Sequence, residues 1–172
     1  VFAVRLSKRP KDKFFSIKGY DEVMFMFSAN IGEKPLPLQK IASGGEASRI
    51  MLAIKTILAD ADSTQTLIFD EVDTGISGKT ATIVAEKMRA LSACKQVLCV
   101  THMAQIAAAA DFNFFISKNV RDQRTVTSLC VLDEAKKTAE IARLLSGQSD
   151  DEKSIDLSRQ MIERSTKTST IE

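Results

Sequence analysis

Apolar and polar residues alternate near the start of the chain, a pattern typical of strands with one covered face. The alternating apolar residues are Phe2, Val4, Leu6, Val23, Phe25 and Phe27. A polar turn over 9–12 follows the first run and leads to another apolar run over 14–17. We therefore predict a small antiparallel sheet within residues 1–40. A loop over 30–37, which holds one glycine and two prolines, is expected to follow its strands.

From residue 46 onward, helical and strand-like patterns alternate along the chain. Helical spacing of apolar residues predicts helices over 46–58, 80–91, 104–110, 133–145 and 155–164. Short apolar runs predict strands over 66–70, 96–100, 112–117 and 124–132. The alternating order over 66–117 predicts three parallel strands with right-handed crossovers, the first of them buried on both faces. The last strand is expected to pair with 112–117 across a polar turn over 119–123. The fold class predicted is therefore α/β.

The length of 172 residues suits one domain, with 44% apolar and 27% charged residues. We expect three parts within it: antiparallel strands and loop over 1–40, a core over 41–147, and a terminal helix with a frayed end over 148–172. No apolar stretch approaches the roughly 18 residues of a membrane span, so we expect no membrane partner and a cytoplasmic location. The first residue is Val1 rather than Met, which suggests a piece of a longer protein.

The net charge and the cysteines exclude few classes of function. The net charge of +2 does not argue for nucleic acid, and the basic cluster at Lys8, Arg9, Lys11 and Lys13 is more simply a solvated hairpin tip. Three cysteines without a C-x-x-C pair indicate neither a disulfide framework nor a zinc site. Cys99 and Cys130 lie in apolar runs, where we expect buried thiols that act as small hydrophobic side chains.

The segment Ser43-Gly44-Gly45-Glu46 precedes the first predicted helix. Its S-x-x-E spacing is that of a capping box, which only starts a helix. The two glycines add something that a cap does not need, because they bare the free N–H groups at the positive end of the helix dipole. A phosphate group could bind there. Phosphate binding and plain capping both remain open for this segment taken alone.

Acidic residues follow one predicted parallel strand and a histidine follows the next. Asp70 and Glu71 end the apolar run 66–70, whereas Thr101 and His102 follow 96–100. Parallel strands of an open sheet place ligands at their carboxyl ends. In nucleotide hydrolysis, Asp70 would hold Mg²⁺ and Glu71 would deprotonate the attacking water, with His102 at the γ-phosphate. A strand that runs into an acidic loop, and a structural histidine, are the plainer alternatives.

One segment between these residues resembles a phosphate-binding P-loop without being one, and we call it the decoy P-loop. Gly75-Ile76-Ser77-Gly78-Lys79-Thr80 ends like a P-loop, but the first glycine of that motif would fall on Asp73. The carboxylates of Asp70, Glu71 and Asp73 would repel a triphosphate, by about 1 kcal/mol or more per close pair. We therefore reject this reading. No other segment matches a Walker A motif, so the sequence predicts half of an ATPase site.

The motifs together resemble the ABC type of ATPase. Ser43-Gly44-Gly45-Glu46 looks like the signature loop, 67–71 the Walker B strand, 73–77 the D-loop region and Thr101-His102 the switch histidine. The wording S-G-G-E-x-S-R-I-M-L-A-I-K, F-D-E-V-D-T-G-I-S-G and V-L-C-V-T-H-x-x-Q-I-A is similar to the RecN family of bacterial SMC-like DNA repair proteins. The likeness extends over 19–147.

This resemblance implies the C-terminal lobe of an ABC/SMC-type ATPase head. Its partner would be the N-terminal head segment of the same polypeptide, which brings the Walker A lysine. Two such heads would form a homodimer around ATP and Mg²⁺, and the complete protein would act on DNA at the nucleoid. The residues implied at the nucleotide are Ser43, Gly44, Gly45, Glu46, Asp73 and Ser77, beside catalytic Glu71 and His102 and the magnesium ligand Asp70.

Two departures from the general ABC pattern stand out: Ala42 replaces the usual Leu, and Ser77 stands where many relatives have the D-loop Asp. Two other functions remain open. A transporter-type nucleotide-binding subunit is disfavoured by Glu46, where transporters more often carry Gln. A non-enzymatic dimerisation module would use the same surface without hydrolysis.

Overall fold

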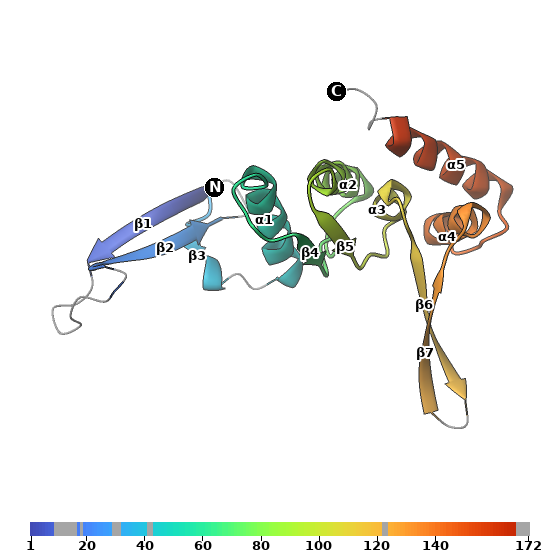
Figure 1. The fold of residues 1–172 in the computed structure, drawn as a ribbon, viewed down its shortest axis with the longest axis horizontal. Coiled ribbons are helices and arrows are strands. Elements are labelled where there is room, and N and C mark those ends of the chain that lie inside the picture. The colour runs from blue at the N-terminus through green and yellow to red at the C-terminus, as the bar shows by residue number, and fades with distance from the viewer. Residues whose placement is uncertain (9–16, 18, 29–31, 41–42, 122–123, 168–172) are drawn as a thin grey trace. The chain divides into compact units, whose positions relative to one another are not determined.

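The computed structural model describes residues 1–8, 17, 19–28, 32–40, 43–121 and 124–167 (Figure 1). Contacts divide the chain into two compact units, Val1–Ala47 and Ser48–Glu172. The boundary falls within helix α1 (Gly44–Ile57). Each unit is therefore described by itself.

The first unit is a three-stranded antiparallel sheet. An antiparallel sheet was predicted for this part of the chain, but the third strand lies within residues 30–37, where the prediction of a loop was wrong for 36–37. It contains β1 (Phe2–Lys8), β2 (Asp21–Phe27) and β3 (Leu36–Pro37), followed by the short 3₁₀ helix η1 (Leu38–Lys40). The register pairs Val4 with Phe25, and the rings of Phe2 and Phe25 stack 5.8 Å apart. The predicted turn over 9–12 and most of the run over 14–17 lie outside the described residues.

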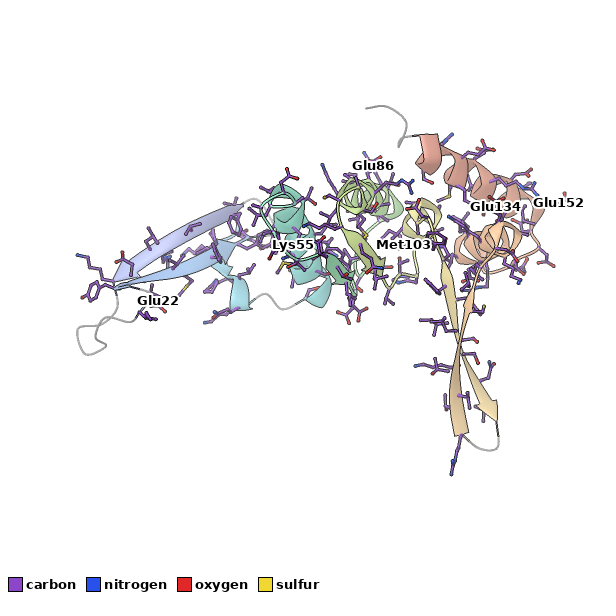
Figure 2. The ribbon with its side chains drawn as sticks, viewed as in Figure 1. Glu22, Lys55, Glu86, Met103, Glu134 and Glu152 are labelled. Carbon is purple, nitrogen blue, oxygen red and sulfur yellow. The ribbon has the colours of Figure 1, made fainter. Side chains whose placement is uncertain are left out.

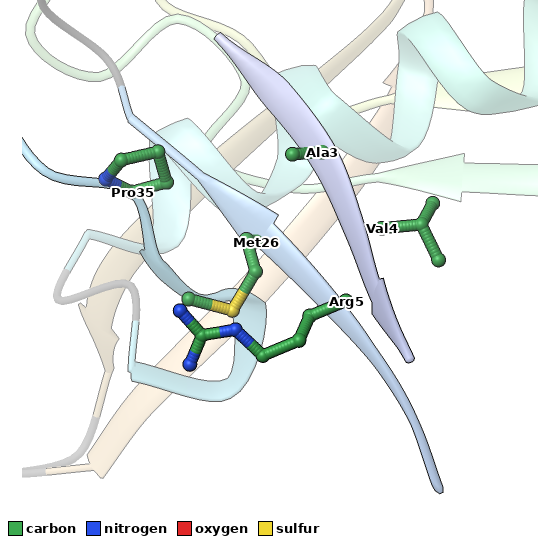
Figure 3. Close-up of a pocket in the computed structure, with 5 residues that line it drawn as sticks. All are labelled: Ala3, Val4, Arg5, Met26 and Pro35. Carbon is green, nitrogen blue, oxygen red and sulfur yellow. The ribbon is translucent and has the colours of Figure 1, made fainter. Parts of the chain in front are cut away.

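The two faces of this sheet differ. Met26 is buried on one face, beside a shallow hollow that Arg5 and Pro35 also line (Figure 3). On the other face the apolar residues are about half exposed or more: Phe2, Val4, Leu6, Val23 and Phe25. The alternation seen in the sequence is thus the alternation of the two faces.

The second unit is built on a parallel pair of strands, β4 (Thr66–Phe69) and β5 (Gln96–Cys99). Helix α2 (Gly78–Ser92) connects them, and α3 (Ala104–Ala109) follows β5. Leu67 and Phe69 pack in one core with residues of α1, α2 and α3: Leu52, Ala81, Val84, Ala85, Met88, Leu91 and Ile106. Met103, labelled in Figure 2, packs against the same core.

The prediction that the first parallel strand is buried on both faces is wrong for this chain. Ile68 is 71% exposed and Leu98 is 43% exposed, whereas Phe69 is only 3% exposed. Successive side chains of a strand point to opposite faces. The described helices cover the face that carries Leu67 and Phe69, so the opposite face of the sheet is open.

The third parallel strand was also predicted incorrectly. The strand β6 (Phe114–Arg121) pairs antiparallel with β7 (Arg124–Val131), and among the described residues it joins no other strand. The pairing of these two runs was predicted correctly, and they form the long hairpin in Figure 1. Cys130 was expected to be buried but is exposed, as is all of β7. No layer of described helices covers this hairpin.

Two helices end the described chain. Helix α4 (Glu134–Ser146) begins at the cap Asp133, which accepts a hydrogen bond from the Lys136 N–H, and α5 (Glu152–Lys167) begins earlier and ends later than predicted. Glu134 and Glu152 lie in their first turns, where the helix dipole favours a negative charge (Figure 2). Ile141 packs with alanines of α3: Ala104, Ala107 and Ala108.

A search of the described residues for a helix long and apolar enough to cross a membrane finds none.

Candidate functional site

The predicted acids and the predicted histidine follow neighbouring strands. Asp70 and Glu71 come directly after β4, and His102 comes shortly after β5. The two strands are parallel with Phe69 opposite Cys99, and the Val100 N–H donates to the Phe69 carbonyl at 3.0 Å. The carboxyl ends of both strands therefore lie at one edge of the sheet. The side chains of Asp70, Glu71 and His102 are all exposed there, open to a ligand.

Glu71 has an unusual backbone conformation. Its φ of 58° makes it the one non-glycine residue with positive φ among the described residues. Such a conformation costs a bulky residue about 1–2 kcal/mol. The Glu71 N–H donates to Asp70 Oδ1 at 2.9 Å, and the Glu71 carbonyl accepts from the Thr74 N–H at 3.0 Å. These bonds hold a tight turn that a glycine would adopt with less strain.

Asp73 lies within this turn, and its side chain contacts the segment that follows β5. Its side chain is 3% exposed. Its Oδ2 accepts from the Thr101 hydroxyl at 2.5 Å and from the His102 N–H at 2.8 Å, and it lies 3.1 Å from His102 Nδ1. The structure thus brings Asp73 together with His102, as a buried carboxylate.

Arg49 of α1 was missed by the sequence analysis. Its guanidinium donates from NH1 to the Val72 carbonyl at 3.1 Å and to the Thr74 carbonyl at 2.9 Å. These carbonyls flank Asp73 on either side. The available signal was its spacing from the buried Leu52, because residues three apart share a helix face and an arginine beside the core needs acceptors.

Ser77 and the decoy P-loop have local structural contacts. Ser77 caps α2, and its Oγ accepts from the Thr80 N–H at 3.4 Å. Gly78 is packed so closely that an added Cβ would lie 2.9 Å from Gln105 Nε2. Gly75 has φ 72°, and Lys79 is exposed. The segment is therefore a tight turn followed by a capped helix.

The glycine motif lies in the first unit, where α1 begins at Gly44. The Ser43 carbonyl accepts from the Ala47 N–H at 3.1 Å, which places Ser43 at the cap position, and Glu46 lies in the first turn. Gly44 is exposed but Gly45 is buried. Of the two glycines, only Gly44 therefore leaves this end of the helix open to solvent.

Metal binding can be tested against the side chains present. Among the described residues, no group of three or more His, Cys, Asp or Glu side chains is arranged to hold a metal ion. Magnesium needs fewer protein ligands, because it keeps several waters and takes one or two carboxylates beside phosphate oxygens. The exposed carboxylate of Asp70 fits that requirement.

Cys99, at the end of β5, is a poor nucleophile. Burial, together with the negative charges of Asp73 and Asp70, raises the pKa of its thiol to about 12. Because the thiolate is the reactive form, the structure gives Cys99 no covalent role at this edge.

Comparison with solved structures identifies the fold. The Smc head domain with a coiled coil and joint from Pyrococcus yayanosii matches 84% of this chain and 26% of that chain, with a TM-score of 0.55 and 20% identity. The fold is therefore that of an Smc head domain. This confirms the predicted fold class, a parallel sheet with flanking helices and a small antiparallel sheet.

Comparison with curated sequences identifies the relatives. The DNA repair protein RecN of Treponema pallidum is 51% identical over 129 residues, which are 75% of this chain and 22% of that protein. RecN of Bacillus subtilis is 48% identical over 130 residues, 76% of this chain and 23% of that protein. No family model matches the chain. The chain is thus similar to RecN over about three quarters of its length, which confirms the resemblance seen in the motifs. It spans less than a quarter of the length of these relatives.

Proposed function

We propose that this chain is the C-terminal head segment of a RecN-type ATPase that acts in the repair of DNA double-strand breaks. In the complete protein, two heads bind ATP and Mg²⁺ between them and hydrolyse the ATP. The observation that carries the proposal is the meeting of Asp70, Glu71 and His102 at one sheet edge, on the fold of an SMC-type head. The similarity to proteins named for DNA repair supports the biological setting.

Each residue at this edge has a distinct role in the proposal. Asp70 holds Mg²⁺, which neutralises charge on the phosphates when it is bound. Glu71 orients the attacking water and takes its proton, and His102 contacts the γ-phosphate. The positive φ of Glu71 supports its role, because strained residues concentrate at functional sites.

The glycine motif supplies the contact between heads. Ser43, Gly44 and Gly45, with Glu46 in the first turn, meet the γ-phosphate bound to the other head of the homodimer. The exposed N-terminal end of α1 at Gly44 supports this role, because free N–H groups and the helix dipole favour an anion there. Asp73 and Ser77 belong to the D-loop between the two sites. DNA is bound by the complete protein, at the nucleoid in the cytoplasm.

The missing half of the site comes from the N-terminal head segment of the same polypeptide, which carries the Walker A lysine. The open face of the β4–β5 sheet supports this proposal, since Ile68, Leu98 and Val100 are 71%, 43% and 56% exposed. An apolar sheet face of this kind is normally covered. The chain alone therefore binds ATP weakly and hydrolyses it negligibly.

The decisive experiment is Glu71→Gln in the complete protein. The amide keeps the shape of the side chain but cannot accept a proton, so hydrolysis should slow by about 10² or more while ATP binding persists. Sedimentation with ATP should show dimers that accumulate. Lys79→Ala serves as the matched control, because Lys79 belongs only to the decoy P-loop and should leave turnover unchanged. Normal hydrolysis in the Glu71 variant would remove Glu71 from the mechanism. An unmodified complete protein that dimerises with ATP but does not hydrolyse it would instead favour a non-enzymatic dimerisation module.

A further inference from the structure

Asp73 is the one charged residue among the buried polar residues of the described chain, which are Ser28, Asp73, Ser154 and Ser158. An ionised carboxylate in such a place requires strong hydrogen-bond donors. Asp73 finds them on one segment, the Thr101-His102 pair that follows β5. The contact therefore joins the loop after β4 to the loop after β5.

The geometry fixes one ring nitrogen of His102. Asp73 Oδ2 lies 3.1 Å from Nδ1, and an ionised carboxylate repels the lone pair of a bare ring nitrogen, which favours a proton on Nδ1. The bond from the His102 N–H to the same oxygen, at 2.8 Å, holds the backbone in place. The His102 side chain is nevertheless 71% exposed. The opposite nitrogen, Nε2, is thus the one offered to a ligand.

Two further contacts hold the carboxylate in position. The Thr101 hydroxyl donates to Oδ2 at 2.5 Å, and its own oxygen accepts from the Met103 N–H at 3.0 Å. Arg49 binds the carbonyls of Val72 and Thr74, one residue before and one after Asp73. The carboxylate is therefore fixed both by its own acceptor contacts and by its backbone.

We propose that Asp73 is a positioning residue for His102: it fixes the ring orientation and the Nδ1–H tautomer, so that Nε2 is presented to the γ-phosphate. The inference rests on the proposed function for the identity of the ligand, but not for the Asp73–His102 contact. It assigns Asp73 a role that acts through His102, in place of the direct nucleotide contact implied by the D-loop resemblance. Carboxylates orient histidines in this way at catalytic and metal sites.

The test reads the histidine ring directly. His102 is the only histidine of this chain, and a His102→Gln variant identifies its signal in spectra of the complete protein with isotope-labelled histidine. Two-bond proton–nitrogen correlations, recorded without nucleotide, report which ring nitrogen is protonated. We expect the Nδ1–H form in the unmodified protein, and its loss in Asp73→Asn. Because the unmodified protein gives a decisive reading, the inference stays testable even if the variant folds poorly.

The same variants are then assayed for ATP hydrolysis. Asp73→Asn should lower kcat by about 10-fold to 100-fold and change the KM for ATP little. Asp133→Asn, at the cap of α4, is the matched control and should change neither the ring signal nor kcat. A ring that carries its proton on Nε2 in the unmodified protein, or an unchanged signal in Asp73→Asn, would overturn the positioning role whatever the hydrolysis rate. A lost Nδ1–H signal with normal hydrolysis would confirm the contact and overturn instead the proposed role of His102.

Discussion

The two strand pairs of the second unit, β4–β5 and β6–β7, have similar apolar sequences and very different surroundings. In the first pair, Leu67 and Phe69 lie in a core with residues of three helices. In the second, Phe114, Ile116 and Leu129 are each more than half exposed. A two-stranded hairpin without such a covering is marginally stable in water. An alternating apolar pattern is thus enough to form a strand. Covering helices are needed in addition to hold the end of that strand in place, and with it Asp70, Glu71 and His102.

The largest expected difference between the two pairs is in stability. Phe69→Ala should destabilise the head by about 3–5 kcal/mol, because it leaves a cavity in the core. Leu129→Ala, at a residue that is 62% exposed, should change stability by at most about 0.5 kcal/mol. Hydrogen exchange in the complete protein measures the local free energy of opening in both variants. Equal costs would show that the hairpin is covered in the complete protein and would break the comparison.

A smaller effect is expected from the contacts that hold the turn after β4, next to Asp70 and Glu71. Arg49→Met keeps the length of the side chain but leaves the carbonyls of Val72 and Thr74 without their donor, at a cost of about 1–2 kcal/mol. The control is Arg143→Met, because the Arg143 guanidinium is paired with Glu140 on the surface of α4. That variant should cost at most about 0.5 kcal/mol. The measurement is the melting temperature of each variant. Similar decreases in melting temperature would show that the contacts of Arg49 contribute no more to stability than a surface ion pair does.

The same contrast shows what the sequence could predict. The strands 66–70 and 96–100 and their helices were recognised because their periodicity is strong and their connection is local. That β6 stands outside the parallel sheet of the described residues was not predicted, because a short apolar run is compatible with a parallel or an antiparallel neighbour. The burial of Asp73 depends on Thr101 and His102, about thirty residues further along the chain, and a polar loop carries no sign of that contact. The helical spacing of Arg49 from Leu52 was a signal, but its acceptors, the carbonyls of Val72 and Thr74, could not be predicted because they lie in that same distant loop.

The backbone of Glu71 allows a more local test of the rigid edge. Glycine adopts positive φ without strain, whereas alanine does not, so Glu71→Gly should be more stable than Glu71→Ala by about 1 kcal/mol. Both variants should lose hydrolysis, since neither has a carboxylate. Thermal melting of the two, side by side, checks the stability difference. Equal melting temperatures would mean that the turn relaxes once the Glu71 side chain is removed, and that the strain depends on that side chain.

The least disruptive test uses one thiol from each strand pair and changes no residue. Cys99 on β5 is half-buried, with its pKa raised to about 12, whereas Cys130 on β7 is exposed. At pH 8 a thiol with that pKa is about 10⁻⁴ ionised, and alkylation requires the thiolate. We therefore expect Cys130 to be alkylated readily in the native protein and Cys99 to be protected until the chain unfolds. Mass spectrometry of peptides after timed labelling gives both rates. Equal labelling of the two thiols would show that the edge of the β4–β5 sheet opens as freely as the hairpin. The positions of Asp70, Glu71 and His102 would then have to be fixed by other parts of the complete protein.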